Sequence, residues 1–198
     1  MIFVNQLEHK DLPYPTNLSA PEKEREMDGT VASSGCGLCS VMMMLDRLCL
    51  DGISLTDVRD LSEEIQANMN PGTDMHILGA EIARRFDLIM ETSNDTDEME
   101  KWLMTGGCVI ANPGGDHEEH YGLFTHGGHY IVLIATTGAE FVVLDPSIRP
   151  DKFTEEKRQG RVRTAGRFVY VNRKELEADT ENRNPRYYMF KRKSDRAE

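Results

Sequence analysis

The segment Ser33-Ser34-Gly35-Cys36-Gly37-Leu38-Cys39-Ser40 places a cysteine among small residues, directly before an apolar helix. Apolar residues at helical spacing predict that helix over Cys36–Cys49: Leu38, Val41, Met42, Leu45 and Leu48. Either Ser33 or Ser34 can cap it. A thiol in the first turn of a helix lies near unpaired backbone N–H groups and the positive end of the helix dipole, which lower its pKa. Cys36 is therefore a candidate nucleophile.

Two later segments carry residues that complement a nucleophilic cysteine. Gly127-Gly128-His129-Tyr130 opens an apolar strand, and Leu144-Asp145-Pro146 closes the next one. A histidine can take a proton from a thiol, and a carboxylate can orient the histidine. Cysteine, histidine and aspartate in this order indicate a cysteine-nucleophile enzyme.

The hairpin between these segments allows a geometric prediction. Thr136-Thr137-Gly138 is typical of a three-residue turn whose glycine is left-handed, and this turn pairs Ala135 with Ala139. Counting outward, His129 lies opposite Asp145 on the same face. Opposed Cβ atoms are about 4.5–5.5 Å apart, which brings the carboxylate within reach of the imidazole.

Apolar periodicity predicts helices first and strands afterwards. Three further helices carry the apolar sets Val58-Leu61-Ile65-Met69, Met75-Leu78-Ile82-Phe86 and Met99-Trp102-Leu103, with cap candidates Ser54 or Thr56, Thr73 or Asp74, and Asp95 or Thr96. Strands are predicted at Cys108–Ala111, Tyr130–Ala135, Phe141–Leu144, Phe168–Val171 and Tyr187–Phe190, with a short one possible at Ile2–Val4, and the charged segment 151–163 is predicted to be exposed. This order predicts an α+β fold in which helices pack on a mostly antiparallel sheet. Residues 1–32 are interpreted as an N-terminal arm and residues 33–198 as one domain.

Three motifs together resemble a known family. Ser-Gly-Cys-Gly-x-x-Ser around Cys36, Gly128-His129-Tyr130-Ile131-Val132 and Val143-Leu144-Asp145-Pro146 resemble segments of the bacteriocin-processing, double-glycine peptidase-like family of papain-like cysteine peptidases. The resemblance spans about residues 29–148. It implies a papain-like fold and hydrolysis of a peptide or other amide through a thioester acyl-enzyme. It further implies that Cys36 is the nucleophile, His129 the general base and acid, and Asp145 the residue that orients His129.

The sequence departs from the family at two positions. Leu38 stands where the family usually has proline, and leucine begins a helix without difficulty. Members often carry a glutamine six residues before the cysteine, where this chain has Thr30. The oxyanion donors would then be the Cys36 backbone N–H and a second group, for which Thr30, Ser34 and the distant Gln6 are candidates.

Small residues around the candidate site are expected to line a cleft. Gly35 and Gly37 flank Cys36 and are expected to leave room for a substrate. Gly128 precedes His129, and His126 stands three residues before it, so both are also cleft-lining candidates.

Two other functions stay open at this point. A relative without the glutamine donor could bind peptides with little catalysis. Cys36-Gly37-Leu38-Cys39 also has the C-x-x-C spacing of a redox pair, although a thioredoxin-like fold requires a βαβ unit before that motif and only an irregular arm precedes it. The other thiols, Cys49 and Cys108, are predicted to be buried.

Net charge, hydropathy and loop sequence argue against several classes of partner and cofactor. The net charge of −11 argues against nucleic acid or an anionic membrane surface and is compatible with a peptide substrate. No apolar run is long enough to span a membrane, and the N-terminus lacks signal-peptide features, so we expect a cytoplasmic protein if Met1 is the native start. His117, His120 and His126 lie in a glycine-rich acidic loop that we interpret as solvated, with no metal or other cofactor.

Overall fold

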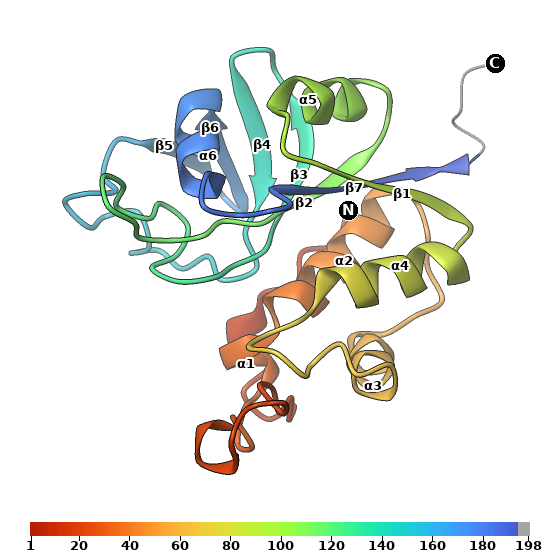
Figure 1. Cartoon of the computed structure of the whole chain (residues 1–198). Coiled ribbons are helices and arrows are strands. Elements are labelled where there is room, and N and C mark those ends of the chain that lie inside the picture. Colours follow the sequence, from red (N-terminus) through yellow and green to blue (C-terminus); the bar gives the residue numbers. More distant parts are fainter. Residues whose placement is uncertain (194–198) are drawn as a thin grey trace.

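Seven antiparallel strands form one sheet at the centre of the computed structural model, which describes residues 1–193 (Figure 1). The strand order is β1-β7-β2-β3-β4-β6-β5. The strands are β1 (Leu88–Ser93), β2 (Cys108–Ala111), β3 (Ile131–Thr136), β4 (Glu140–Leu144), β5 (Val162–Ala165), β6 (Phe168–Asn172) and β7 (Tyr187–Arg192). The predicted α+β class with an antiparallel sheet is confirmed.

Helices cover both faces of the sheet (Figure 1). One face packs against α2 (Cys36–Arg47) and α4 (Met75–Arg85), with α3 (Leu55–Glu64) behind α2 and the short α1 (Val31–Ser34) before it. The other face packs against α5 (Thr96–Met104) and α6 (Arg173–Thr180). Successive residues of β3 alternate between the two cores, since Val132 belongs to the α2 side and Leu133 to the α5 side.

Local sequence signals determine where the helices begin. Ser54 accepts a hydrogen bond from the backbone N–H of Asp57 at the start of α3, and Asp74 and Asp95 accept equivalent bonds at α4 and α5. The structure therefore confirms one of the two cap candidates predicted for each of α3, α4 and α5. The prediction that Ser33 or Ser34 caps α2 is wrong, because Gly35 is its N-cap and no side chain caps it. At the other end, α2 stops at Arg47, because Cys49 has a left-handed φ of 55°. Cys49 is exposed, so the prediction that it is buried is wrong.

Several elements differ from the predicted order. β1 lies between α4 and α5, and α6 between β6 and β7, so helices and strands are more interleaved than expected. β5 was not predicted, and no strand forms at Ile2–Val4. The segment 151–163 was expected to be exposed, yet Lys152 and Arg158 within it are only 2% exposed. A buried cation leaves no periodic pattern that would reveal it.

The β3–β4 hairpin differs from the predicted three-residue turn. Thr136 pairs with Phe141, and the Thr137 N–H donates to the Glu140 carbonyl at 2.9 Å, so the turn lies further along the chain than predicted. Ala135 accordingly pairs with Val142 rather than with Ala139. The predicted register is therefore wrong.

A β-bulge after Leu133 nevertheless restores the relation between the two candidate residues. Continued past the strand ends, the register before the bulge places His129 opposite Ser147. By the same count Asp145 lies opposite Ile131, which makes His129 and Asp145 diagonal neighbours on one face. Without the bulge, the register of the turn would put them on opposite faces, because side chains alternate with a period of two.

The N-terminal segment packs against the helical layer. It carries two short 3₁₀ helices, η1 (Gln6–Glu8) and η2 (Glu22–Glu24). Tyr14 is fully buried, and its hydroxyl lies 2.8 Å from Ser62 Oγ and 2.9 Å from Thr73 Oγ1. Within residues 1–193, no helix combines the length and the apolar character that crossing a membrane requires.

Candidate active site

Cys36 occupies the first position of α2, as the sequence predicted. It is partly exposed and contributes to a pocket of about 260 Å³. The pocket lies between the α1–α2 junction, the loop before α4 and the segment before β3, and its lining includes Ser34, Cys36, Gly72, Asn112, Gly128 and His129. Two segments distant in the sequence thus place a thiol and an imidazole in one cavity.

The glycines beside Cys36 serve close packing and not substrate access. A Cβ on Gly35 would lie 2.6 Å from the backbone oxygen of Val31, and one on Gly37 would lie 2.7 Å from Thr73 Cβ. Neither glycine is among the residues that line the pocket. The expectation that both leave room for substrate is therefore corrected, because neighbouring protein atoms occupy that space.

His129 is buried, and two oxygens engage one of its ring nitrogens. Its Nε2 lies 2.9 Å from Asp145 Oδ1 and 3.0 Å from Ser147 Oγ. Its backbone N–H donates to the carbonyl of Pro113 at 3.1 Å, which fixes the chain just before β3. Residues that follow β4 therefore hold the ring at Nε2. The ring also interacts with Cys36.

The electrostatics of the thiol and the imidazole favour their charged forms. Burial raises the pKa of the Cys36 thiol, but interaction with the His129 ring and its positive charge outweighs burial, so the pKa lies below the ordinary cysteine value. Burial and the charge of Lys152 lower the pKa of His129, yet hydrogen bonding with Asp145 and Cys36 leaves it above the ordinary histidine value. The lowered thiol pKa and the raised imidazole pKa shift both groups toward their charged forms.

Asp145 is completely buried and forms an ion pair with Lys152. Its Oδ2 accepts a hydrogen bond from Lys152 Nζ at 2.5 Å, and its Oδ1 accepts one from the Ser147 backbone N–H at 2.9 Å. Burial raises the pKa of Asp145, but the ammonium of Lys152 and the hydrogen bond with His129 hold that pKa well below its usual range. Asp145 is thus ionised and held from three sides.

Sequence reasoning missed Lys152 and Ser147. Lys152 Nζ also donates to Ser147 Oγ at 2.6 Å, and the ammonium is nearly as buried as the carboxylate. A signal for Ser147 was available, because Asp-Pro-Ser is a typical Asx-turn in which the aspartate accepts the N–H two residues on. Nothing comparable marked Lys152, which lies in a charged stretch that resembles a solvated loop.

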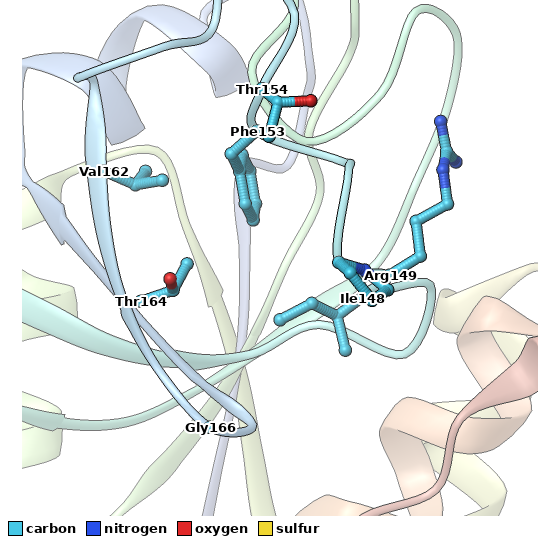
Figure 2. A pocket seen from close by; sticks show the side chains of 8 residues that line it. Ile148, Arg149, Phe153, Thr154, Val162, Thr164 and Gly166 are labelled. Atoms are coloured by element: carbon cyan, nitrogen blue, oxygen red, sulfur yellow. The ribbon is translucent and has the colours of Figure 1, made fainter.

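The segment that carries Lys152 also borders a second cavity, of about 350 Å³. Figure 2 shows this cavity between the segment 148–154 and β5, with Ile148, Phe153 and Val162 around it. None of Cys36, His129 or Asp145 lines it. It is separate from the pocket that contains the thiol.

The three oxyanion candidates occupy different positions. Ser34 lines the pocket beside Cys36. Thr30 forms a capping box with Ser33 at the start of α1 and does not line the pocket. Gln6 is buried and does not line the pocket, and its Nε2 donates to the backbone oxygen of Ala32 at 3.0 Å.

The other sequence candidates lie outside the pocket or at its wall. Gly128 lines the pocket, whereas His126 does not. His126 Nδ1 lies 3.0 Å from Asp116 Oδ2. In the same loop, His120 Nε2 lies 2.8 Å from the fully buried Asp179, which also accepts backbone N–H groups and so braces the loop.

The remaining thiols differ from Cys36 in their surroundings. Cys39 is fully buried, and burial together with the nearby Cys36 raises its pKa far above the ordinary value. Burial raises the pKa of Cys108 to about 12, and its buried position in β2 confirms the prediction. Cys36 and Cys39 are both free thiols.

Comparison with known proteins supports the fold. No family model matches the sequence, and a search of curated proteins found no match. Among solved structures, the chain resembles a Bacillus anthracis protein provisionally described as a C39-like peptidase, with a TM-score of 0.60 and 14% sequence identity. The alignment covers 97% of this chain and 94% of that one. The chain therefore has the fold of a C39-like peptidase, and at this identity the likeness concerns the fold alone.

Proposed function

We propose that the protein is a cysteine peptidase or related amide hydrolase in which Cys36 is the nucleophile. The observation that carries this proposal is the partly exposed Cys36 thiol beside a His129 ring whose Nε2 contacts the buried Asp145 carboxylate. Lowered thiol pKa and raised imidazole pKa favour a nucleophile that is ionised before substrate arrives. The fold of a C39-like peptidase supports the same reading.

The reaction would proceed in two balanced stages. The Cys36 thiolate attacks the amide carbonyl carbon, a C–S bond forms, and the carbonyl π electrons move to oxygen. Collapse of this intermediate breaks the C–N bond, and the amine leaves with a proton from the His129 imidazolium. Neutral His129 then takes a proton from water as the oxygen attacks the thioester, and the acid product leaves as the C–S bond breaks.

Each supporting residue would hold His129 in position. Because Nε2 faces Asp145 and Ser147, Nδ1 is the nitrogen that would exchange the proton with sulfur and substrate. Asp145 stabilises the imidazolium, and Lys152 keeps Asp145 ionised. The oxyanion would form near the Cys36 backbone N–H at the start of α2, with Ser34 as the pocket-lining side-chain candidate.

A catalytically weak peptide-binding protein is the second candidate. The position of Gln6 favours it, because Gln6 does not line the Cys36 pocket, where a side-chain oxyanion donor would be needed. Removal of one oxyanion donor costs about 10²–10³ in rate in peptidases. By contrast, the complete burial of Cys39 disfavours the redox alternative, since a dithiol exchange needs an accessible pair.

Turnover of a peptide library distinguishes these candidates. Incubation of the protein with a mixture of short peptides, followed by mass spectrometry, should reveal cleavage that disappears in Cys36→Ala and persists in Cys39→Ser. Cleavage that persists in Cys36→Ala would refute the assignment. Binding of peptides without cleavage by the parent protein would establish the second candidate.

A further inference from the structure

A guanidinium forms part of the wall of the Cys36 pocket. Arg183 follows α6, and its side chain lines the same cavity as Cys36 and His129. Its backbone N–H donates to the carbonyl of Thr180 at 3.0 Å, which anchors the turn to the end of α6. A residue distant in sequence from the other pocket residues thus brings a permanent positive charge to the candidate site.

Gly128 allows the guanidinium to lie against the segment that holds His129. A Cβ on Gly128 would lie 2.7 Å from an Nη atom of Arg183. The absence of a side chain at Gly128 therefore makes space for Arg183 immediately beside His129. This contact gives the Gly-His-Tyr motif a structural reason that its sequence did not reveal.

Arg183 has no ionic partner among residues 1–193. Its Nε is buried without a hydrogen-bond partner in that part of the chain. None of the ion pairs formed by residues 1–193 includes it. Arg161 and Arg173, by contrast, pair with Glu175 and Glu100.

The one carboxylate in the pocket wall is engaged elsewhere. Glu26 accepts a hydrogen bond from Thr16 Oγ1 at 2.5 Å and a longer one from Ser34 Oγ at 3.3 Å. It forms no ion pair with Arg183 within the described residues. The guanidinium is therefore available to a group that enters the pocket from outside.

We propose that Arg183 binds a carboxylate of the molecule that occupies the Cys36 pocket, so that the site selects acidic peptides over neutral ones. This inference rests on the proposed peptidase function for its biological meaning, although its test does not require turnover. Guanidinium groups bind carboxylates with charge-assisted hydrogen bonds, which are stronger than neutral ones. The carboxylate could belong to an acidic side chain or to a peptide C-terminus.

Alkylation of Cys36 by two matched reagents tests the charge preference directly. Iodoacetate carries a carboxylate, and iodoacetamide is its neutral analogue. The ratio of their alkylation rates at Cys36 therefore measures how strongly the pocket favours a negatively charged group. We expect Arg183→Gln to lower the iodoacetate-to-iodoacetamide ratio about tenfold, while Arg183→Lys keeps most of it. Lys174→Gln is the matched control, because it removes the same charge from an exposed position on α6 and should leave the ratio unchanged.

Peptide protection then identifies the source of the carboxylate. Acetyl-tetra-alanine with a free C-terminus is compared with its amide, and an amidated peptide containing one Glu is compared with its Gln analogue. The pair in which only the acidic member slows iodoacetamide alkylation of Cys36 names the source, and this difference should vanish in Arg183→Gln. If that variant does not fold, as judged by its thermal transition, Arg183→Met replaces it.

The outcomes separate this inference from the proposed function. An unchanged reagent ratio in the folded Arg183 variant, with no acidic peptide protecting the parent, would overturn the carboxylate site. Absence of peptide cleavage would count against the peptidase alone, because alkylation and protection are measured at the thiol without turnover.

Discussion

Substitution of Lys152 by methionine tests the buried charge pair at the site. Methionine keeps a similar length and apolar stem but removes the ammonium that contacts Asp145 at 2.5 Å and Ser147 Oγ at 2.6 Å. Asp145 would then remain completely buried, and only His129 and Ser147 would still form hydrogen bonds with its carboxylate. Removal of one partner of a buried ion pair typically costs about 3–5 kcal/mol of unfolding free energy.

Urea denaturation measures this loss. With a slope of about 2 kcal/mol per molar urea, a loss of about 3–5 kcal/mol lowers the unfolding midpoint by roughly 1.5–2.5 M. The double variant Lys152→Met with Asp145→Asn removes both charges and should recover about half of the loss, because no uncompensated charge remains. Lys174→Met, on the exposed face of α6, should change the midpoint very little.

The pH dependence of the unfolding free energy provides a second, independent test of the Lys152–Asp145 pair. In the parent, the lowered pKa of Asp145 contributes stability that is present above the unfolded value of about 3.9 and is lost as pH falls through the folded value. Without Lys152, burial raises the pKa of Asp145, and protonation at low pH removes the unpaired charge. The deficit of the variant should therefore shrink between pH 7 and about pH 4. A loss below about 1 kcal/mol at pH 7, with no dependence on pH, would refute this reasoning.

Further predictions concern the thiol and its surroundings. Because its pKa is lowered, Cys36 should be alkylated by iodoacetamide at mildly acidic pH, where buried Cys39 stays unmodified; mass mapping of the first modified cysteine checks this, and first modification at Cys39 would contradict it. Any hydrolysis should decline on the alkaline side only above the ordinary histidine pKa, since His129 must stay protonated and its pKa is raised; a decline centred below about 6.5 in a pH–rate profile would argue against the pair. His129→Ala should reduce hydrolysis more than Asp145→Asn, because the first loses proton transfer and the second loses orientation; equal rates in the two variants would exclude that division. Gly37→Ala should lower the thermal midpoint by several degrees, because its Cβ would lie 2.7 Å from Thr73 Cβ, and an unchanged midpoint would show that Thr73 can move away.

The sequence alone determined the elements whose signals are local. Apolar spacing was sufficient to place α2, and apolar spacing with a capping Ser or Asp placed α3, α4 and α5, since a helix buries one face and these three begin where a side chain satisfies the first N–H groups. Motif order also predicted that Cys36, His129 and Asp145 would come together, and the structure places Cys36 and His129 in one pocket and His129 in contact with Asp145. Their catalytic roles stay predictions.

Only the tertiary structure decided the relations between distant residues. The predicted position of the turn in the β3–β4 hairpin was wrong, and a bulge that no local sequence pattern predicts returned His129 and Asp145 to one face. The close approach of Gly37 to Thr73 depends on how α2 meets the loop before α4. Such features depend on contacts between segments that are distant in the sequence. Sequence periodicity indicates only which face of a single helix or strand is apolar.

Two cations near the candidate site show most clearly what local sequence signals cannot predict. Lys152 and Arg183 lie in polar stretches of the sequence that resemble ordinary surface, yet one contacts a buried carboxylate and the other lines the Cys36 pocket. A charge becomes part of a site through the partner or space that folding places beside it, here Asp145 for the lysine and Gly128 for the arginine. Because those neighbours come from other elements, the functional meaning of the two cations exists only in the folded chain.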